Sequence, residues 1–176
     1  DNTTLPADYI RDIKKEYTGV YYERFMLGNW VAAEGVIYPQ FADNPARYII
    51  NTPPDDLIFV SIGGDFGGNG SAHTLNATGF TVGFKYIVTL DEYYRKETIS
   101  PYQLEDDFCN FIEGVCSRYK CTEVYLDSAE QILIKGVKLA AQRRGLRVNI
   151  HNARKSDINK RVIFYNRLMA GGRYKI

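Results

Sequence analysis

Two aspartates, each placed directly after an apolar strand pattern, are the residues of this sequence best suited to chemistry. Asp65 follows an apolar run within "VSIGGDFGGNGSAHT" and lies among five glycines. Asp127 ends "EVYLD", the next comparable pattern, and precedes a predicted helix. Parallel strands deliver their last residues to the same edge of a sheet, so we expect the two carboxylates to converge.

A converging pair of carboxylates predicts a divalent metal site. Two ionised carboxylates held close together repel each other, and cations remove that repulsion. Hard oxygen ligands favour Mg²⁺ or Mn²⁺. Two such ions about 3.5 to 4 Å apart can activate water and stabilise the departing oxygen in phosphodiester cleavage. The glycines around Asp65 are interpreted as leaving room for a polynucleotide phosphate to reach the metal.

Simpler interpretations of the acids stay open. Asp65 could be only an acid in a glycine-rich turn, and Asp127 could be a helix N-cap. Asp91 and Glu92 are poor substitutes as metal ligands, because they follow a strand expected to run antiparallel to the first and therefore to end at the opposite edge.

The net charge of +1 conceals a strong asymmetry along the chain. Residues 1–127 carry 10 Lys and Arg against 19 Asp and Glu, whereas residues 128–176 carry 12 against 2. A basic third is typical of a surface that contacts a polyanion, although it can also pair with an acidic half of the same domain. Basic side chains hold phosphate without reading sequence. The DNA-contact candidates are Arg154, Lys155, Lys160 and Arg161.

The two histidines and three cysteines are weaker candidates. His73 lies in the hairpin near Asp65 and could touch substrate or metal, but a surface histidine is the favoured interpretation. His151 ends a strand and is expected to be structural. The cysteines, at 109, 116 and 121, form no C-x-x-C pair and are expected to be reduced thiols. Cys109 and Cys116 are seven residues apart in a predicted helix, share a face and are expected to be core residues.

Length and composition indicate one soluble α/β domain. A chain of 176 residues with 45% hydrophobic and 24% charged residues can bury a real core. No apolar run approaches the roughly 18 to 20 residues that cross a bilayer, and the first six residues do not resemble a signal peptide, so a cytosolic setting is expected.

The hydrophobic pattern predicts a mixed sheet with the order βββαβαβα after a helical lead-in. Ser100, Pro101 and Gln103 form a capping-box signature for the first helix of that series. The final "RYKI" is typical of the start of another strand. The predicted strands are 57–65, 76–85, 86–90, 123–127 and 147–151, and the predicted helices are 7–26, 101–119, 129–144 and 157–170.

Three segments together resemble the large terminase subunits of tailed bacteriophages. "YYERFMLGNWVAAEGVIYPQF" is similar to the segment that closes their motor domain, and "SIGGDFGGNGSAHT" and "VYLDSAEQILI" resemble the first and second acidic motifs of their nuclease domain. The resemblance covers nearly the whole chain. It implies an RNase H-like nuclease domain at 57–176, with 1–56 as the lead-in and linker from the motor domain.

The resemblance implies a metal-dependent endonuclease that cuts concatemeric double-stranded DNA during genome packaging by a two-metal mechanism. Asp65 would then bridge two Mg²⁺ or Mn²⁺ ions, and Asp127 would hold one of them. The implied partners are double-stranded DNA, the small terminase subunit and the portal protein. The implied location is the host cytoplasm, without a membrane.

The sequence departs from the family pattern in two respects. The motor's Walker A string, G-x-x-x-x-G-K-[ST], is absent from these residues, so they are not the ATPase. The family's third acid is expected beyond Ile176, so the chain is interpreted as an incomplete nuclease domain with impaired activity.

Two other functions are weighed against the nuclease. One is a non-catalytic DNA-binding or docking module of the packaging machine, in which the acids are structural. The other is an actin-like or sugar-kinase fold that uses "DFGGNGS" as a phosphate loop, which is less favoured because the chain is too short for two lobes.

Overall fold

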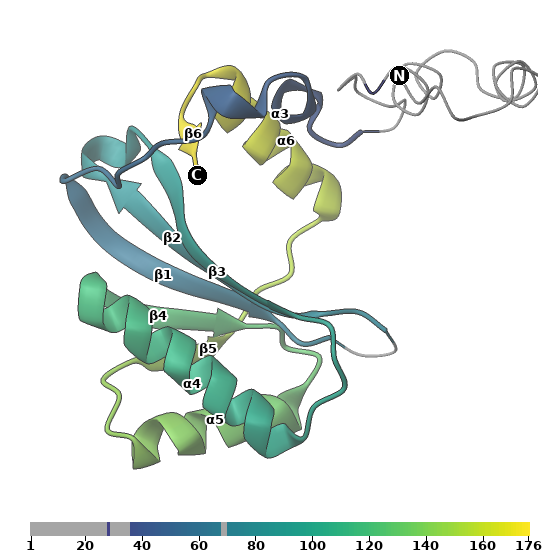
Figure 1. The fold of residues 1–176 in the computed structure, drawn as a ribbon, viewed down its shortest axis with the longest axis vertical. Coiled ribbons are helices and arrows are strands. Elements are labelled where there is room, and N and C mark those ends of the chain that lie inside the picture. The colour runs from purple at the N-terminus through teal and green to yellow at the C-terminus, as the bar shows by residue number, and fades with distance from the viewer. Residues whose placement is uncertain (1–27, 29–35, 68–69) are drawn as a thin grey trace, which may run out of the picture. The chain divides into compact units, whose positions relative to one another are not determined.

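The chain is built around a six-stranded mixed sheet with two helices packed on one face (Figure 1). The computed structural model describes residues 28, 36–67 and 70–176. These residues divide into two compact units. The larger consists of residues 50–157 and 172–176, and the smaller contains residues 28, 36–49 and 158–171. The helix predicted at 7–26 lies outside the described residues.

The sheet has the strand order β5-β4-β1-β2-β3-β6. Strand β1 pairs antiparallel with β2, and β2 pairs antiparallel with β3, so the first three strands form the predicted meander. The pairs β1 with β4, β4 with β5 and β3 with β6 are parallel. The mixed α/β sheet and a strand in "RYKI" are therefore confirmed. The strands are β1 (Leu57–Asp65), β2 (His73–Thr81), β3 (Ile87–Arg95), β4 (Cys121–Leu126), β5 (Asn149–Asn152) and β6 (Tyr174–Lys175).

One face of the sheet forms the core with α4 (Pro101–Arg118) and α5 (Gln131–Arg143), which run along it in Figure 1. Alternate residues of each central strand point to this face, as the two-residue period of a strand requires. Helix α4 supplies an apolar stripe to this core. The buried members of this core include Val60, Ile62, Leu75, Ala77, Val124 and Leu126 from the strands and Leu104, Phe108, Ile112, Val115, Ile134 and Val137 from the helices.

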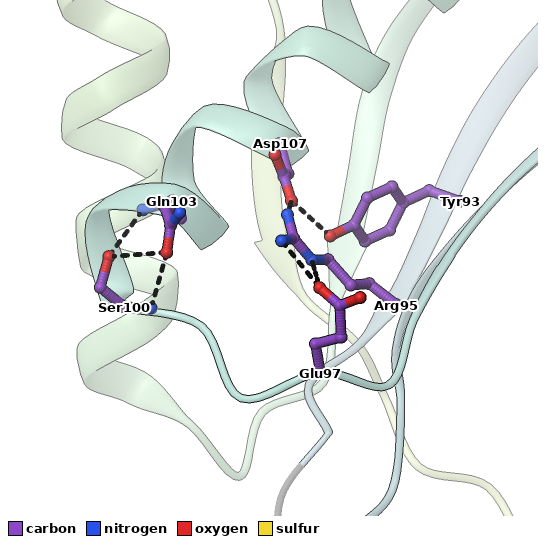
Figure 2. A network of polar contacts seen from close by, with 6 residues as sticks. All are labelled: Tyr93, Arg95, Glu97, Ser100, Gln103 and Asp107. Atoms are coloured by element: carbon purple, nitrogen blue, oxygen red, sulfur yellow. Dashed lines mark hydrogen bonds and ion pairs between the residues drawn. The ribbon is translucent and has the colours of Figure 1, made fainter.

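The predicted capping box fixes the start of α4. The Gln103 backbone N–H donates to Ser100 Oγ at 3.3 Å, and the Ser100 N–H donates to Gln103 Oε1 at 3.3 Å (Figure 2). Two backbone donors at the helix start are thus satisfied by side chains. Pro101 occupies the first turn, where its missing N–H costs nothing. The end of β3 and the start of α4 are joined through this short, well-specified turn.

A carboxylate on α4 ties the same helix to the end of β3. Asp107 Oδ2 accepts from the Tyr93 hydroxyl and from Arg95 Nη1, both at 2.7 Å, and Arg95 also pairs with Glu97 at 3.0 Å (Figure 2). Burial, followed by the hydrogen bond to Asp107, raises the pKa of Tyr93 to about 12. Burial alone would raise the pKa of Asp107, but the bonds from Tyr93 and Arg95 outweigh it and the pKa is lowered.

The boundary between the second and third strands was predicted wrongly. Strand β2 ends at Thr81 rather than at residue 85, and a 3-10 turn, η2 (Val82–Phe84), follows. Gly83 in this turn has φ +64°, and the Tyr86 N–H donates to Thr81 Oγ1 at 2.8 Å to close it. The unbroken apolar pattern through this turn concealed it, because the side chains of Val82 and Phe84 are exposed instead of packed.

The predicted direction of the third strand was also wrong. Two successive antiparallel pairings make β3 parallel to β1, and β3 extends to Arg95, so Asp91 and Glu92 lie within the strand. Asp91 forms an ion pair with Arg118. Glu92 on β3 pairs with Asn76 on β2. Strand β3 is two strands away from β1, so Glu92 lies about 10 Å from β1. That spacing, rather than an opposite edge, separates Glu92 from Asp65.

The smaller unit joins the lead-in segment to the last helix. It contains α3 (Pro39–Asp43), the 3-10 turn η1 (Pro45–Arg47) and α6 (Ile158–Ala170). The Asn166 amide donates to Ile37 O at 3.1 Å, and the rings of Tyr38 and Tyr165 meet edge to face at 6.2 Å. Residues on either side of the predicted boundary at 56/57 therefore share this unit, and the two-domain division stays a prediction.

The cysteines are free thiols. Cys109 is buried as predicted, Cys116 is partly buried against the core, and Cys121, for which no core position was predicted, is also buried. Burial raises the pKa of the Cys109 thiol, and burial together with Cys116 raises that of Cys121 to about 12. In the part of the chain that the structure describes, none of the helices has the length and apolar character needed to span a membrane.

The Asp107 network yields a pH-dependent stability prediction. Replacing Asp107→Asn should lower the free energy of unfolding at neutral pH by about 1–3 kcal/mol, because a charge-assisted acceptor for two donors is lost. Folding lowers the pKa of Asp107. The stabilisation is therefore fully present above the pKa of an unfolded aspartate, about 3.9, and is lost as the pH falls through the lower pKa of the folded state. The measurement is urea unfolding of both proteins across that pH range.

The neighbouring residue provides the matched control for this experiment. The Asp106 side chain is 67% exposed and pairs with Arg144, whereas that of Asp107 is 23% exposed. Replacing Asp106→Asn should cost less than about 1 kcal/mol. Equal losses for the two substitutions would contradict a specific role for the Asp107 network.

Candidate metal site

The two predicted acids lie side by side at the carboxyl ends of β1 and β4. In the parallel register Gly64 pairs with Leu126, which makes Asp65 and Asp127 the next neighbours. The Asp127 N–H donates to Gly64 O at 3.0 Å and prolongs the ladder beyond β4. The two carboxyl groups lie close enough for each to change the pKa of the other. The predicted convergence is therefore observed, while the role of the pair as metal ligands stays a prediction.

Both acids belong to the face of the sheet that α4 and α5 do not cover. Ile62 and Leu126 are completely buried against the helices, and side chains alternate along each strand. Asp65 lies three positions after Ile62, and Asp127 lies one after Leu126, so both point to the opposite face. The hydrophobic core is thus on one side of the sheet and the acid pair on the other.

Asp127 is held by two donors in addition to its partner acid. Its Oδ1 accepts from the Ala129 backbone N–H at 3.1 Å and pairs with Lys155 Nζ at 2.8 Å. Helix α5 begins at Gln131 with Glu130 in the N-cap position, so the N-cap interpretation of Asp127 is wrong. The carboxylate instead closes an Asx-type turn two residues on, which orients it before the helix starts.

The surroundings of the two acids push their pKa values apart. Partial desolvation, followed by the hydrogen bond and negative charge of Asp127, raises the pKa of Asp65, and Lys155 only partly opposes this. The Lys155 hydrogen bond and then the Ala129 N–H lower the pKa of Asp127. Asp65 is therefore the weaker acid of the two, and Asp127 the stronger. Two carboxylates held this close favour a positive charge between or beside them, and Lys155 supplies one at Asp127.

The glycines around Asp65 are needed for different structural reasons. The sequence interpretation gave them all a single role, which was to leave room for a phosphate. A Cβ at Gly64 would lie 2.5 Å from a Leu75 methyl and 2.7 Å from a Leu126 methyl, so Gly64 is required by the core. A Cβ at Gly67 would lie 2.4 Å from backbone atoms of Ser71 and Ala72. A Cβ at Gly63 would meet nothing within 4 Å. Among the three, only Gly63 leaves open space beside the acids.

The four predicted DNA-contact residues fall in two different parts of the chain. The Ala153 N–H donates to Leu126 O at 2.7 Å, which holds the segment after β5 against the end of β4 and delivers Lys155 to Asp127. Arg154 is exposed in the same segment. Lys160 and Arg161 are exposed on α6, in the smaller unit. Contact of any of the four with DNA stays a prediction.

Both histidines make contacts within the protein, as expected for His151, and an outward-facing tyrosine is present that the sequence analysis did not single out. His73 Nδ1 accepts from the Gly67 N–H at 3.1 Å, so this ring fastens the hairpin after Asp65. His151 Nε2 lies 2.7 Å from Glu123 Oε2, and its ring stacks on Tyr125 with centroids 5.2 Å apart. The position of Tyr125 between the core residues Val124 and Leu126 is the signal that could have predicted an outward-facing ring.

The donor set suits a hard divalent cation. Two carboxylates from adjacent strands supply oxygen ligands, and a lysine ammonium already lies against one of them, which shows that this position accommodates positive charge. Mg²⁺ is commonly bound through one or two carboxylates with water completing its shell. Among the described residues no group of three or more His, Cys, Asp or Glu side chains is arranged to hold a metal ion.

Comparison with solved structures identifies the architecture. The P22 large terminase nuclease domain aligns with a TM-score of 0.56 at 13% identity, over 81% of this chain and 72% of that one. A human cytomegalovirus terminase nuclease domain, soaked with Mn and bound to an inhibitor, aligns with a TM-score of 0.53 at 12% identity, over 71% and 67%. The chain has the fold of the terminase nuclease domains.

The resemblance inferred from the motifs is thus confirmed at the level of the fold, including its RNase H-like mixed sheet. The large terminase nuclease domain from bacteriophage SPP1, with bound Mn, also aligns, with a TM-score of 0.44 at 20% identity. The alignment spans 61% of this chain and 58% of the SPP1 domain. No family model matches the sequence, and no curated protein matches it.

The glycine geometry predicts opposite effects of one substitution at two positions. Gly67→Ala should lower the melting temperature, because its Cβ would meet backbone atoms that can yield only by shifting the hairpin. A cost of about 1–3 kcal/mol is expected from such overpacking. Gly63→Ala should be neutral or slightly stabilising, because the added methyl meets nothing and the unfolded chain loses entropy. Thermal unfolding followed by circular dichroism measures both, and equal melting temperatures would contradict the prediction.

Proposed function

We propose that this chain is the metal-dependent endonuclease domain of a viral DNA-packaging terminase, which cuts concatemeric double-stranded DNA by a two-metal mechanism. Asp65 and Asp127 would bind Mg²⁺ or Mn²⁺, and the basic residues after β5 would contact the DNA backbone. The small terminase subunit and the portal protein would be its partners in the host cytoplasm.

The observation that carries this proposal is the pair of neighbouring acids at the ends of two parallel strands. The fold supports it, because the P22 and human cytomegalovirus proteins with the same architecture are terminase nuclease domains. Solved structures of the cytomegalovirus domain include Mn-soaked ones. The acid pair and the fold come from independent observations, one from local geometry and one from the whole chain.

Different residues of this chain would bind the metal ions, contact the DNA and leave space for it. Bound divalent ions would supply an activated water and stabilise charge on the departing oxygen. Asp65 and Asp127 would hold the ions. Arg154, and Lys155 when it leaves Asp127, would provide cations for phosphate oxygens of the strand. Gly63, which has open space above it, would leave the approach to Asp65 unobstructed.

Metal binding is the most direct prediction of this proposal. Titration of the protein with Mn²⁺, followed by electron paramagnetic resonance, should show binding that Asp65→Asn or Asp127→Asn weakens about 10-fold or more, because each removes one of two charged ligands. Mn²⁺-dependent nicking of supercoiled plasmid should fall about 100-fold or more in the same variants.

Asp106→Asn is the matched control, since it removes an exposed carboxylate from α4 without touching the acid pair. It should leave both Mn²⁺ binding and nicking unchanged. If the unaltered protein binds no Mn²⁺, or if the control loses as much binding as Asp65→Asn, the metal-site proposal is wrong.

The docking-module alternative is retained because, among the described residues, two acids converge without a third ligand. The two functions predict different effects of metal on DNA affinity. A docking module should bind duplex DNA equally well with and without Ca²⁺, and Asp65→Asn should change nothing. A nuclease site should bind DNA more tightly with Ca²⁺, and Asp65→Asn should remove that gain. Fluorescence anisotropy with labelled duplex distinguishes them.

A further inference from the structure

An open hollow lies over β4, β5 and the segment that follows β5. It has a volume of about 680 Å³. This lies within the range of about 300 to 1,000 Å³ that is usual for small-molecule sites. The lining residues are Tyr125, His151, Asn152, Ala153 and Arg154, all in the larger unit.

The wall of the hollow is an aromatic pair held in a fixed orientation. The rings of Tyr125 and His151 stack with an interplanar angle of 25°, on neighbouring residues of β4 and β5. Glu123 fixes the histidine, because its Oε2 lies 2.7 Å from Nε2 and its Oε1 accepts from the Asn149 amide at 2.8 Å. Tyr125 is nevertheless 42% exposed. A large ring that is exposed and oriented, but outside the core, is suited to stacking.

The residues that line the hollow lie close along the chain to Asp127 and to its partner Lys155. Tyr125 lies two residues before Asp127 on the same face, which places them about 7 Å apart along the strand. Arg154 lines the hollow, and the next residue, Lys155, bonds Asp127. A strand whose phosphate lies at the acids would therefore present an adjacent nucleotide to the aromatic pair and a second phosphate to Arg154.

We propose that this hollow binds an unpaired nucleotide of the DNA strand, with its base stacked on the Tyr125–His151 pair and its phosphate held by Arg154. The inference rests on the proposed function, since it takes DNA as the ligand. Bases are stacked on their neighbours inside a duplex, so an aromatic side chain gains a base face only where the strand is open or a base is extruded. DNA bound here is therefore locally unpaired beside the acid pair.

The test compares two short duplexes of the same length, one fully paired and one with a small unpaired bubble, by fluorescence anisotropy in Ca²⁺. The unaltered protein should bind the bubble more tightly. Tyr125→Leu should weaken bubble binding about 5- to 150-fold, the range measured for removing one base–aromatic stack, and should leave the paired duplex nearly unaffected. Tyr125→Phe should keep the bubble preference, because stacking needs the ring and not the hydroxyl.

Two further variants separate the hollow from general effects. Tyr102→Leu removes a 76% exposed tyrosine from α4 and should change neither affinity. Arg154→Gln should weaken both DNAs and reduce the slope of log affinity against log salt by about one, as expected for one phosphate contact. Circular dichroism melting of each variant shows that its fold is kept.

The outcomes decide between the two proposals. If the unaltered protein does not prefer the bubble, or if Tyr125→Leu keeps the preference or weakens both DNAs equally, the stacking site is wrong, whatever the metal experiments show. If Mn²⁺ binding and nicking are absent but the Tyr125-dependent preference is found, the nuclease proposal is wrong and the nucleotide site stands.

Discussion

The parallel pairing of β1 with β4 is the constraint on which the site depends. Because both strands run in the same direction, their last residues arrive at one edge, and the register that pairs Gly64 with Leu126 makes the two aspartates neighbours. A shift of one residue in either strand would turn its aspartate into the core. The same shift would expose Ile62 or Leu126, so the free energy of the core holds the acids in place.

One face of the sheet therefore forms the hydrophobic core, and the other carries the residues of the proposed site. The covered face contains closely packed aliphatic and aromatic side chains, and even Gly64 lacks room for a methyl group there. The open face contains the acids, the Tyr125–His151 pair and the space above Gly63. Alternation along a single strand, Leu126 inward and Tyr125 outward, produces both. Chemistry on the open face can thus change without repacking the core.

Local signals predicted most of the fold, and pairing direction was the main failure. The capping box at Ser100 is predictable from a few adjacent residues, and it is present in the structure. The direction of β3 was predicted wrongly because it follows from two successive antiparallel pairings, which together make it parallel to β1. The turn at Val82 was missed because it contains apolar residues, which are exposed in the structure. The acid pair was predictable from strand ends. The Lys155 contact was not, since it depends on how the segment after β5 is fastened to Leu126.

The bond between Lys155 and Asp127 changes how any cation reaches the acids. The oxygen that a metal ion would need already carries an ammonium 2.8 Å away, so entry of an ion there is an exchange of one positive group for another. The carboxylate is neutralised in the resting protein and does not depend on solution ions for its charge balance. Binding of an ion at this oxygen would also release the Lys155 side chain, which would then add one positive charge to the surface beside the site.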